Sequence, residues 1–201
     1  MPTLADKLDH GVLKRAVRER YARVATEPNA RLGFPVGRAF AQAIGYPTEL
    51  LDRVPGAAAS FTGVGTPVEA ARLQPGELAL ELGCGAGLDT IWAAGEVQPG
   101  GRVVAIDMAC PMVEATRRNV RQAGVRGVLP VVAEAEALPV ASASIDVVLV
   151  NGIFNLSPDK AAVMREVRRV LRPTSRLVAS EVALARPLAP GEASSLDDWF
   201  R

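Results

Sequence analysis

The chain has 201 residues, of which 49% are hydrophobic and 22% are charged, and its formal net charge is +1; it suits one globular domain with an N-terminal extension and gives no argument for a nucleic-acid or anionic-membrane partner. Two cysteines and one histidine are too few for a zinc cluster of these residues, so we expect neither a metal site nor a disulfide framework. The N-terminus is polar where a signal peptide would be apolar, and no apolar run approaches the roughly 18 residues of a membrane span, which predicts a cytoplasmic protein.

Residues 12–25 have the periodicity of an amphipathic helix, with one apolar face and arginines opposite. A helix packed on the core is the simpler interpretation, and a lid over a ligand, with Tyr21 facing that ligand, is the alternative. Residues 26–65 are rich in Gly, Pro and Ala, with short helices expected at 36–44 and 48–53. We therefore predict a helical extension or lid at 1–65 and a second, ligand-binding domain at 66–201.

Residues 78–87 (LALELGCGAG) predict a strand followed by a glycine-rich loop. The segment Leu78–Leu82 is apolar except for Glu81, as in a buried strand. Three glycines alternate along the loop: Gly83, Gly85 and Gly87. Such a loop lets a ligand approach the backbone and the N–H groups of the next helix. The dinucleotide pattern G-x-G-x-x-G fails at Leu88, and the Glu81 carboxylate would repel a pyrophosphate; a tight turn without any ligand is the other alternative.

Strand and helix patterns continue to alternate after this loop. Four further strands are predicted, at 102–106, 128–132, 145–150 and 176–182, with helices at 111–123 and 158–171. Pro130 should place its strand at a sheet edge because proline cannot donate to a ladder. The alternation predicts an α/β fold with a doubly wound, mainly parallel sheet. Ligands of such sheets bind beyond the carboxyl ends of the strands.

Polar side chains stand at those carboxyl ends: Glu81, Asp107, Glu134 and Asn151. Asp107 follows Gly87 by 20 residues, the distance at which this kind of fold places an acid that accepts hydrogen bonds from ribose hydroxyls. A helix N-cap is the alternative role for Asp107. The four side chains together predict one ligand site at this edge of the sheet.

Residues 66–182 resemble class I S-adenosylmethionine-dependent methyltransferases, whose first motif, E/D-x-G-x-G-x-G, is met in full from Glu81 to Gly87. More narrowly they resemble the arsenite methyltransferase-like branch, mainly through NLSPDK at 155–160. The stretches that carry the resemblance are 73–87 (LQPGELALELGCGAG), 104–112 (VAIDMACPM), 133–139 (AEAEALP), 151–160 (NGIFNLSPDK) and 169–181 (RVLRPTSRLVASE).

The resemblance implies a Rossmann-like core that binds S-adenosylmethionine and methylates a small-molecule acceptor. The methionine part of the cofactor would be held by Glu81 and the loop of Gly83, Cys84, Gly85 and Gly87. Its nucleoside part would meet Asp107 at the ribose, Met108 against the adenine, and Glu134 with Ala135 at the adenine amino group. Asn151 would line the methyl-donor end. Glu181 would border the substrate or be a strand-end surface acid, and the catalytic residues stay open.

The chain departs from the branch at its arsenic-binding cysteines, whose positions hold Val64 and Gly152. We therefore expect an organic acceptor and not arsenite. A cofactor-binding module without catalysis and a nicotinamide-dependent oxidoreductase are the alternatives. We expect no strand beyond the fifth within this sequence, since only 19 residues follow Val182. The exposed edge of the fifth strand predicts a cover: a homodimer, a partner chain or further C-terminal sequence.

Overall fold

The computed structural model describes residues 9–27 and 33–186, and its centre is one five-stranded sheet with the order β3-β2-β1-β4-β5. The strands are β1 (Leu78–Leu82), β2 (Arg102–Asp107), β3 (Val128–Val132), β4 (Ile145–Asn151) and β5 (Leu171–Ser180). All four pairings are parallel, which confirms the predicted α/β sheet. The chain runs outward from β1 to β3 and then returns to β4. The crevice between β1 and β4 is therefore the point where this topology places a ligand.

The burial of each strand follows its position in the sheet. β1 and β4 pair on both sides and are almost wholly buried, because a central parallel strand is covered on both faces. β3 pairs only with β2, and Pro130 lies in it opposite Ala105. Its side chains Leu129 and Val132 are 60% and 45% exposed. The predicted edge position of this strand is confirmed.

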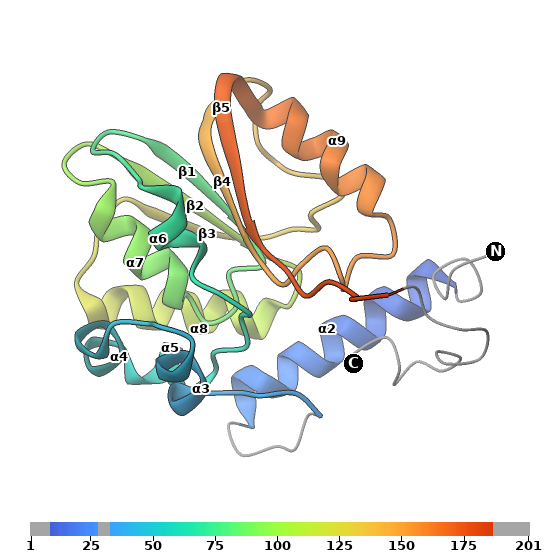
Figure 1. Cartoon of the computed structure of the whole chain (residues 1–201), viewed down its shortest axis with the longest axis horizontal. Helices are drawn as coiled ribbons and strands as arrows, with labels where there is room; N and C mark the ends of the chain where they lie inside the picture. The colour runs from blue at the N-terminus through green and yellow to red at the C-terminus, as the bar shows by residue number, and fades with distance from the viewer. Residues whose placement is uncertain (1–8, 28–32, 187–201) are drawn as a thin grey trace.

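Helices cover both faces of the sheet (Figure 1). One face carries α6 (Pro67–Ala71), α7 (Leu88–Glu96) and α8 (Cys110–Ala123). The other carries α9 (Lys160–Val170), whose Val163, Val167 and Val170 pack on apolar side chains of β1 and β4. Residues 133–144, which join β3 to β4, contain no helix and place Leu138 on this second face. This arrangement confirms the doubly wound fold.

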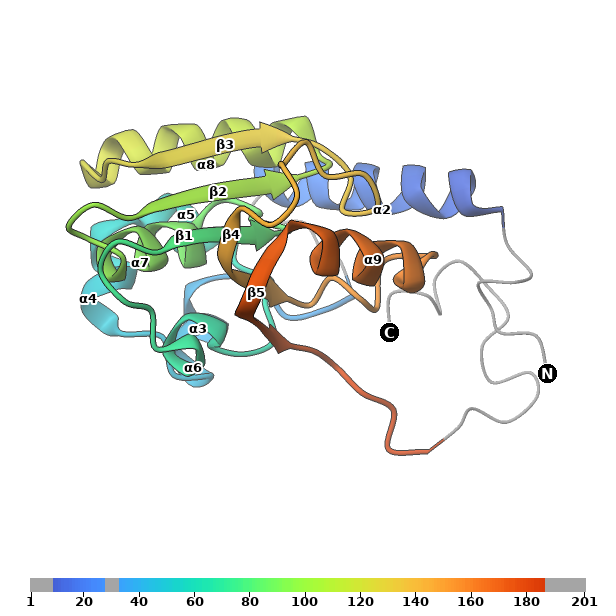
Figure 2. The same ribbon diagram turned by 90° about the horizontal axis from the view of Figure 1, so that it is seen from above.

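The N-terminal extension is helical, as predicted. It contains α2 (His10–Thr26), α3 (Arg38–Ala43), α4 (Thr48–Arg53) and α5 (Pro55–Ala59), the last of which was not foreseen. Asp9 caps α2 by accepting a hydrogen bond from the Val12 N–H at 2.9 Å. α2 packs beside α8 and continues past the carboxyl ends of the strands (Figure 2). The extension therefore covers the end of the sheet where a ligand is expected, while the domain boundary at 65/66 stays a prediction.

The fifth strand differs from its prediction at both ends. β5 starts at Leu171, directly after α9, instead of at Arg176, and ends at Ser180 instead of Val182. The register jumps from Ile145↔Leu171 to Val147↔Arg176, so residues 172–175, which separate the predicted helix from the predicted strand, form an irregularity within an edge strand. Between residues 33 and 186 no strand pairs with the outer edge of β5. The predicted cover of this edge stays a prediction.

None of the helices in the described part of the chain is both long enough and apolar enough to cross a membrane.

We expect Glu166→Gln to destabilise the fold at neutral pH, by about 1.5–3 kcal/mol, the contribution of hydrogen bonds to a charged group. The Glu166 carboxylate accepts hydrogen bonds from Arg169 at 2.7 Å and from the Leu138 N–H at 2.7 Å, which joins α9 to the helix-free segment. The Arg169 guanidinium lowers the pKa of Glu166 from 4.5 to about 2. A depressed pKa contributes stability above the unfolded value that is lost as pH falls through the folded one.

The stability gap between wild type and Glu166→Gln should therefore shrink as pH falls from 4.5 to about 2. Urea unfolding at several pH values measures it, and Glu69→Gln, on the exposed side of α6, is the control. A gap that does not depend on pH would contradict the assignment.

Candidate functional site

A cavity of about 800 Å³, counted with its open mouth, lies over the carboxyl ends of the strands and beneath α2. Its walls come from α2, from the glycine loop, and from the segments that follow β2, β3 and β4. The lining residues are Lys14, Val17, Arg18, Tyr21, Thr62, Gly83, Gly85, Ile106–Ala109, Ala133, Ala135, Glu136, Asn151–Ile153 and Leu156–Pro158. A smaller cavity of about 340 Å³ lies between the glycine loop and residues 57–63. Both cavities share Thr62, Gly83, Gly85 and Asn151.

The glycine loop brings bare backbone to the boundary of the two cavities. Gly83, Gly85 and Gly87 have φ values of 73°, 53° and 90°, which favour glycine. A Cβ at Gly83 would collide with the side chain of Ile153, and one at Gly87 would lie 3.0 Å from Thr116. At Gly85 a Cβ would meet nothing within 4 Å. Packing and positive φ therefore both disfavour a side chain at the outer two glycines, while the middle one leaves its backbone open to a ligand.

Glu81 and Gly87, which were predicted to contact the cofactor, line neither cavity. The Glu81 carboxylate is 3% exposed and accepts a short hydrogen bond from the Thr90 hydroxyl. Burial, with the nearby Asp89 carboxylate, raises the pKa of Glu81 well above its ordinary value. Gly87 precedes the first turn of α7. The cofactor role of both residues stays a prediction.

Cys84 lines only the smaller cavity. Its thiol is buried 3.7 Å from the Thr116 hydroxyl, and burial raises the pKa of this thiol. A neutral buried thiol is unreactive, so Cys84 can offer a ligand little besides its backbone.

Asp107 lies in the wall of the larger cavity, together with Met108. One carboxylate oxygen accepts from the Gly85 N–H at 2.9 Å and the other from the Ala109 N–H at 2.8 Å. The N-cap of α8 is Ala109 and not Asp107. Burial raises the pKa of Asp107, and these backbone hydrogen bonds oppose that shift. Because a carboxylate offers about four acceptor positions, Asp107 can still accept hydrogen bonds from two ligand hydroxyls.

Glu134, predicted to bind the adenine amino group, makes ion pairs with α2 instead. Its oxygens lie 2.6 Å from Lys14 Nζ and 3.1 Å from Arg18 Nη2. It does not line the cavity, whereas its neighbours Ala135 and Glu136 do. These contacts attach α2 to the end of β3, and the predicted adenine contact of Glu134 stays untested.

Asn151 lines both cavities, but its amide is already committed to the N-terminal extension. Its Oδ1 accepts from the backbone N–H groups of Val64 and Gly65 at 2.7 and 3.2 Å. Its Nδ2 donates to the Gly65 carbonyl and to the Asp89 carboxylate, both at 2.9 Å. The structure therefore shows Asn151 holding a loop, and its role at the methyl-donor end stays a prediction.

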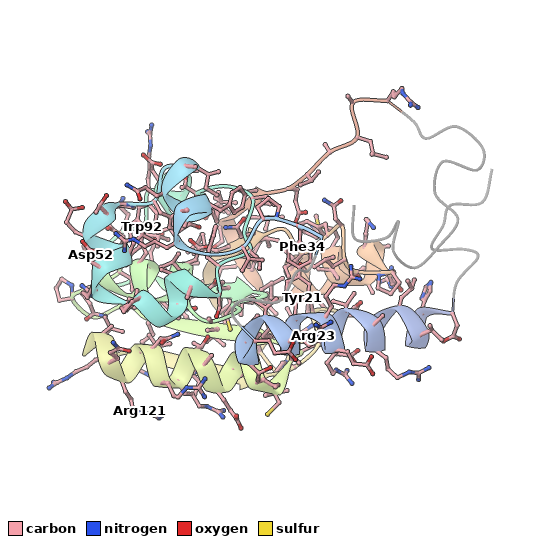
Figure 3. The ribbon with its side chains drawn as sticks, turned by 90° about the horizontal axis from the view of Figure 1, so that it is seen from below. Tyr21, Arg23, Phe34, Asp52, Trp92 and Arg121 are labelled. Atoms are coloured by element: carbon pink, nitrogen blue, oxygen red, sulfur yellow. The ribbon has the colours of Figure 1, made fainter. Side chains whose placement is uncertain are left out.

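The helix α2, for which a lid was the alternative interpretation, forms one wall of the larger cavity. Lys14, Val17, Arg18 and Tyr21 have the spacing of a single helical face. The ring of Tyr21 stacks on Phe34 with centroids 5.8 Å apart (Figure 3), and burial raises the pKa of its hydroxyl. This placement supports the lid alternative, in which Tyr21 faces the ligand.

Val64 and Gly152 lie next to each other although they are distant in the sequence. Asn151, which directly precedes Gly152, is 87 residues from Val64. A Cβ at Gly152 would lie 3.7 and 3.8 Å from the two Cγ atoms of Val64. Glu181, on the same side of the site, accepts hydrogen bonds from the N–H groups of Ile153 and Phe154 with its Oε1. Its Oε2 is buried without a hydrogen-bond partner in the described chain. The two positions at which the arsenite branch has cysteines are therefore neighbours in the folded chain.

Comparison with known proteins agrees with this geometry. Residues 73–201 match the family model of a methyltransferase domain. The chain is 34% identical to an arsenite methyltransferase of Halobacterium salinarum over 92% of its own length and 51% of the relative. It is 31% identical to a demethylmenaquinone methyltransferase of Listeria monocytogenes over 65% of this chain and 54% of that one. The chain spans about half the length of the curated relatives it matches.

A solved structure shows the same likeness. The arsenic(III) S-adenosylmethionine methyltransferase of Chlamydomonas reinhardtii superposes with a TM-score of 0.60 and 31% identity, over 77% of this chain and 52% of that chain.

Proposed function

Because this chain belongs to the class I S-adenosylmethionine-dependent methyltransferases, we propose that it methylates a small organic acceptor and not arsenite. One observation carries the proposal. The cavity at the β1/β4 crevice joins the open backbone of Gly85 to the carboxylate of Asp107, and its wall includes Gly152, which lies next to Val64; these are the two positions at which the resemblance to the arsenite branch implies cysteines.

The residues present fit the family's cofactor, S-adenosylmethionine. The nucleoside would lie in the larger cavity, where Asp107 has acceptor positions left for ribose hydroxyls and Met108 and Ala135 supply apolar walls. The amino-acid tail would lie in the smaller cavity, between the backbone of Gly85 and residues 57–63. The shared wall at Asn151 would then lie near the reactive centre.

When bound, the sulfonium supplies an activated methyl group: the lone pair of the acceptor bonds to the methyl carbon while the C–S bond breaks and its electrons return to sulfur. The protein has to hold the acceptor in line, and proximity of this kind can supply about 7–11 kcal/mol of barrier reduction. The ionisable residues in the wall of the larger cavity are Lys14, Arg18, Tyr21, Asp107 and Glu136.

Most of these side chains are already engaged, which limits general base catalysis. Lys14 lies 3.4 Å from Glu136, Arg18 pairs with Glu134, and Asp107 holds two backbone N–H groups. The pKa of Tyr21 is raised by burial, so its hydroxyl stays protonated near neutral pH and cannot act as a general base. We therefore infer an acceptor whose nucleophilic atom is deprotonated or soft before it binds.

The positions of the two cysteine thiols argue against arsenite as the substrate. Trivalent arsenic is a soft centre that prefers converging thiolates. The Cys84 thiol points to Thr116, and Cys110 is exposed on α8 beside Glu114. Neither belongs to the wall of the larger cavity.

Calorimetry tests the cofactor, and turnover tests catalysis. We expect S-adenosylhomocysteine to bind and NAD to give no heat, because Leu88 stands where the dinucleotide pattern has its third glycine. No heat with S-adenosylhomocysteine at millimolar concentration would contradict the proposal. Formation of S-adenosylhomocysteine from S-adenosylmethionine in a panel of phenols, carboxylates, thiols and amines would then identify the acceptor class. Binding without turnover on any member would favour a cofactor-binding module.

A further inference from the structure

Tyr46 lies outside both cavities but at the centre of the polar network behind them. It is 3% exposed and precedes α4. Its hydroxyl oxygen lies 2.6 Å from Asp89 Oδ1, 3.0 Å from the Gly65 carbonyl oxygen and 3.1 Å from Asn151 Nδ2. Neither cavity has Tyr46 in its wall, whereas Asn151 lines both and Asp89 lines the smaller one.

The number of hydrogens on the Tyr46 hydroxyl and the Asn151 amide decides which group donates in each of these contacts. A phenol has one hydrogen, and the contact of 2.6 Å to a carboxylate is the shorter and charge-assisted one. Tyr46 therefore donates to Asp89. The two amide hydrogens of Asn151 face three acceptors, the Gly65 carbonyl, Asp89 Oδ2 and the Tyr46 hydroxyl, so Tyr46 accepts a shared hydrogen from Asn151. Burial, followed by the Asp89 carboxylate, raises the pKa of Tyr46, which stays protonated. Burial raises the pKa of Asp89 to about 6, and the bonds from Asn151 and Tyr46 keep it from rising further.

This network joins three segments that are distant in sequence. Asp89 belongs to the first turn of α7, Asn151 ends β4, and the Gly63–Gly65 loop comes from the N-terminal extension. The loop approaches Asn151 so closely that a Cβ at Gly63 would overlap the Asn151 amide. The side-chain orientation of Asn151 therefore sets the position of the loop, and Tyr46 and Asp89 set that orientation.

We propose that Tyr46 is a positioning residue for the methyl-transfer site, because its hydroxyl fixes Asn151 and Asp89 and, through Asn151, the Gly63–Gly65 loop. The inference rests on the proposed function and adds to it a residue that contacts neither ligand. Ordering these walls before binding reduces the ordering cost that the cofactor must meet.

Tyr46→Phe tests this inference, since it removes the hydroxyl and keeps the ring contacts with Phe61 and Trp92, at 4.6 and 5.5 Å. We expect S-adenosylhomocysteine affinity, measured by calorimetry, to fall roughly tenfold, as for loss of a hydrogen bond to a charged group. Hydrogen exchange of the Val64 and Gly65 amides, which donate to Asn151, should accelerate by a similar factor. Trp92→Phe is the matched control: Trp92 contacts the Tyr46 ring in the same aromatic cluster, and its indole N–H donates to the exposed Glu96 and not to the polar network.

The outcomes separate the alternatives. Weaker binding and faster exchange in Tyr46→Phe alone, with both variants melting close to each other, support positioning. Unchanged affinity in Tyr46→Phe, or an equal loss in Trp92→Phe, would overturn it in favour of a purely structural role. If the wild-type protein does not bind S-adenosylhomocysteine at all, the proposed function fails and this inference fails with it.

Discussion

Asp107→Ala is expected to weaken S-adenosylhomocysteine binding by roughly tenfold or more and to leave the protein folded. Each hydrogen bond to a charged group contributes about 1.5–3 kcal/mol, and about 1.4 kcal/mol corresponds to a factor of ten. The variant would lose the hydrogen bonds from the ribose hydroxyls to the carboxylate. It would also lose the bonds that the carboxylate accepts from the Gly85 and Ala109 N–H groups, which hold the glycine loop to the end of β2.

Calorimetry on the wild type, Asp107→Ala and Asp107→Asn measures this effect. The asparagine variant should lose less, because its amide oxygen can still accept from one backbone N–H. Asp146→Asn is the matched control: Asp146 also accepts from a backbone N–H, that of Leu78 at 2.8 Å, and pairs with Arg172 at the opposite end of the sheet. A folded Asp107→Ala protein with wild-type affinity would leave Asp107 a purely structural role.

No methylated arsenic is expected when the protein is incubated with arsenite, thiol and S-adenosylmethionine, whereas Val64→Cys combined with Gly152→Cys should create an arsenite site. The Cβ position at Gly152 lies within 3.8 Å of both Cγ atoms of Val64, so two thiolates there would converge on one ion. Gly152 has a φ of 77°, and a side chain in this conformation costs about 1–2 kcal/mol. The double variant should therefore be less stable.

Equilibrium dialysis with arsenite, followed by measurement of bound arsenic, compares this double variant with Val64→Ser combined with Gly152→Ser, which has the same backbone strain without thiols. Tighter arsenite binding by the cysteine pair alone is the expected result. Equal binding by the two pairs would mean that the two loops do not converge in solution. Methylated arsenic from the wild-type protein would refute the exclusion of arsenite.

The amino-acid sequence by itself determined the parallel sheet and the site's location. Strands that are buried on both faces are nearly continuous apolar runs, as Val147–Val150 is, and Pro130 can lie only where no outer partner strand needs its N–H. The alternate glycines after β1 have positive φ, a backbone property that sequence records directly. These features depend on a residue and its near neighbours, which is why local patterns were sufficient.

Only the tertiary structure decided which polar side chains are still available to a ligand. Glu134 is paired with Lys14, 120 residues away, and Asn151 is bonded to Tyr46, 105 residues away. α2 forms a cavity wall because it packs against α8, which lies far from it in the sequence. Residue type and spacing show that a carboxylate or an amide stands at a strand end. Its hydrogen-bond partner depends on which distant segment the folded chain brings within about 3 Å, and no local pattern encodes that distance.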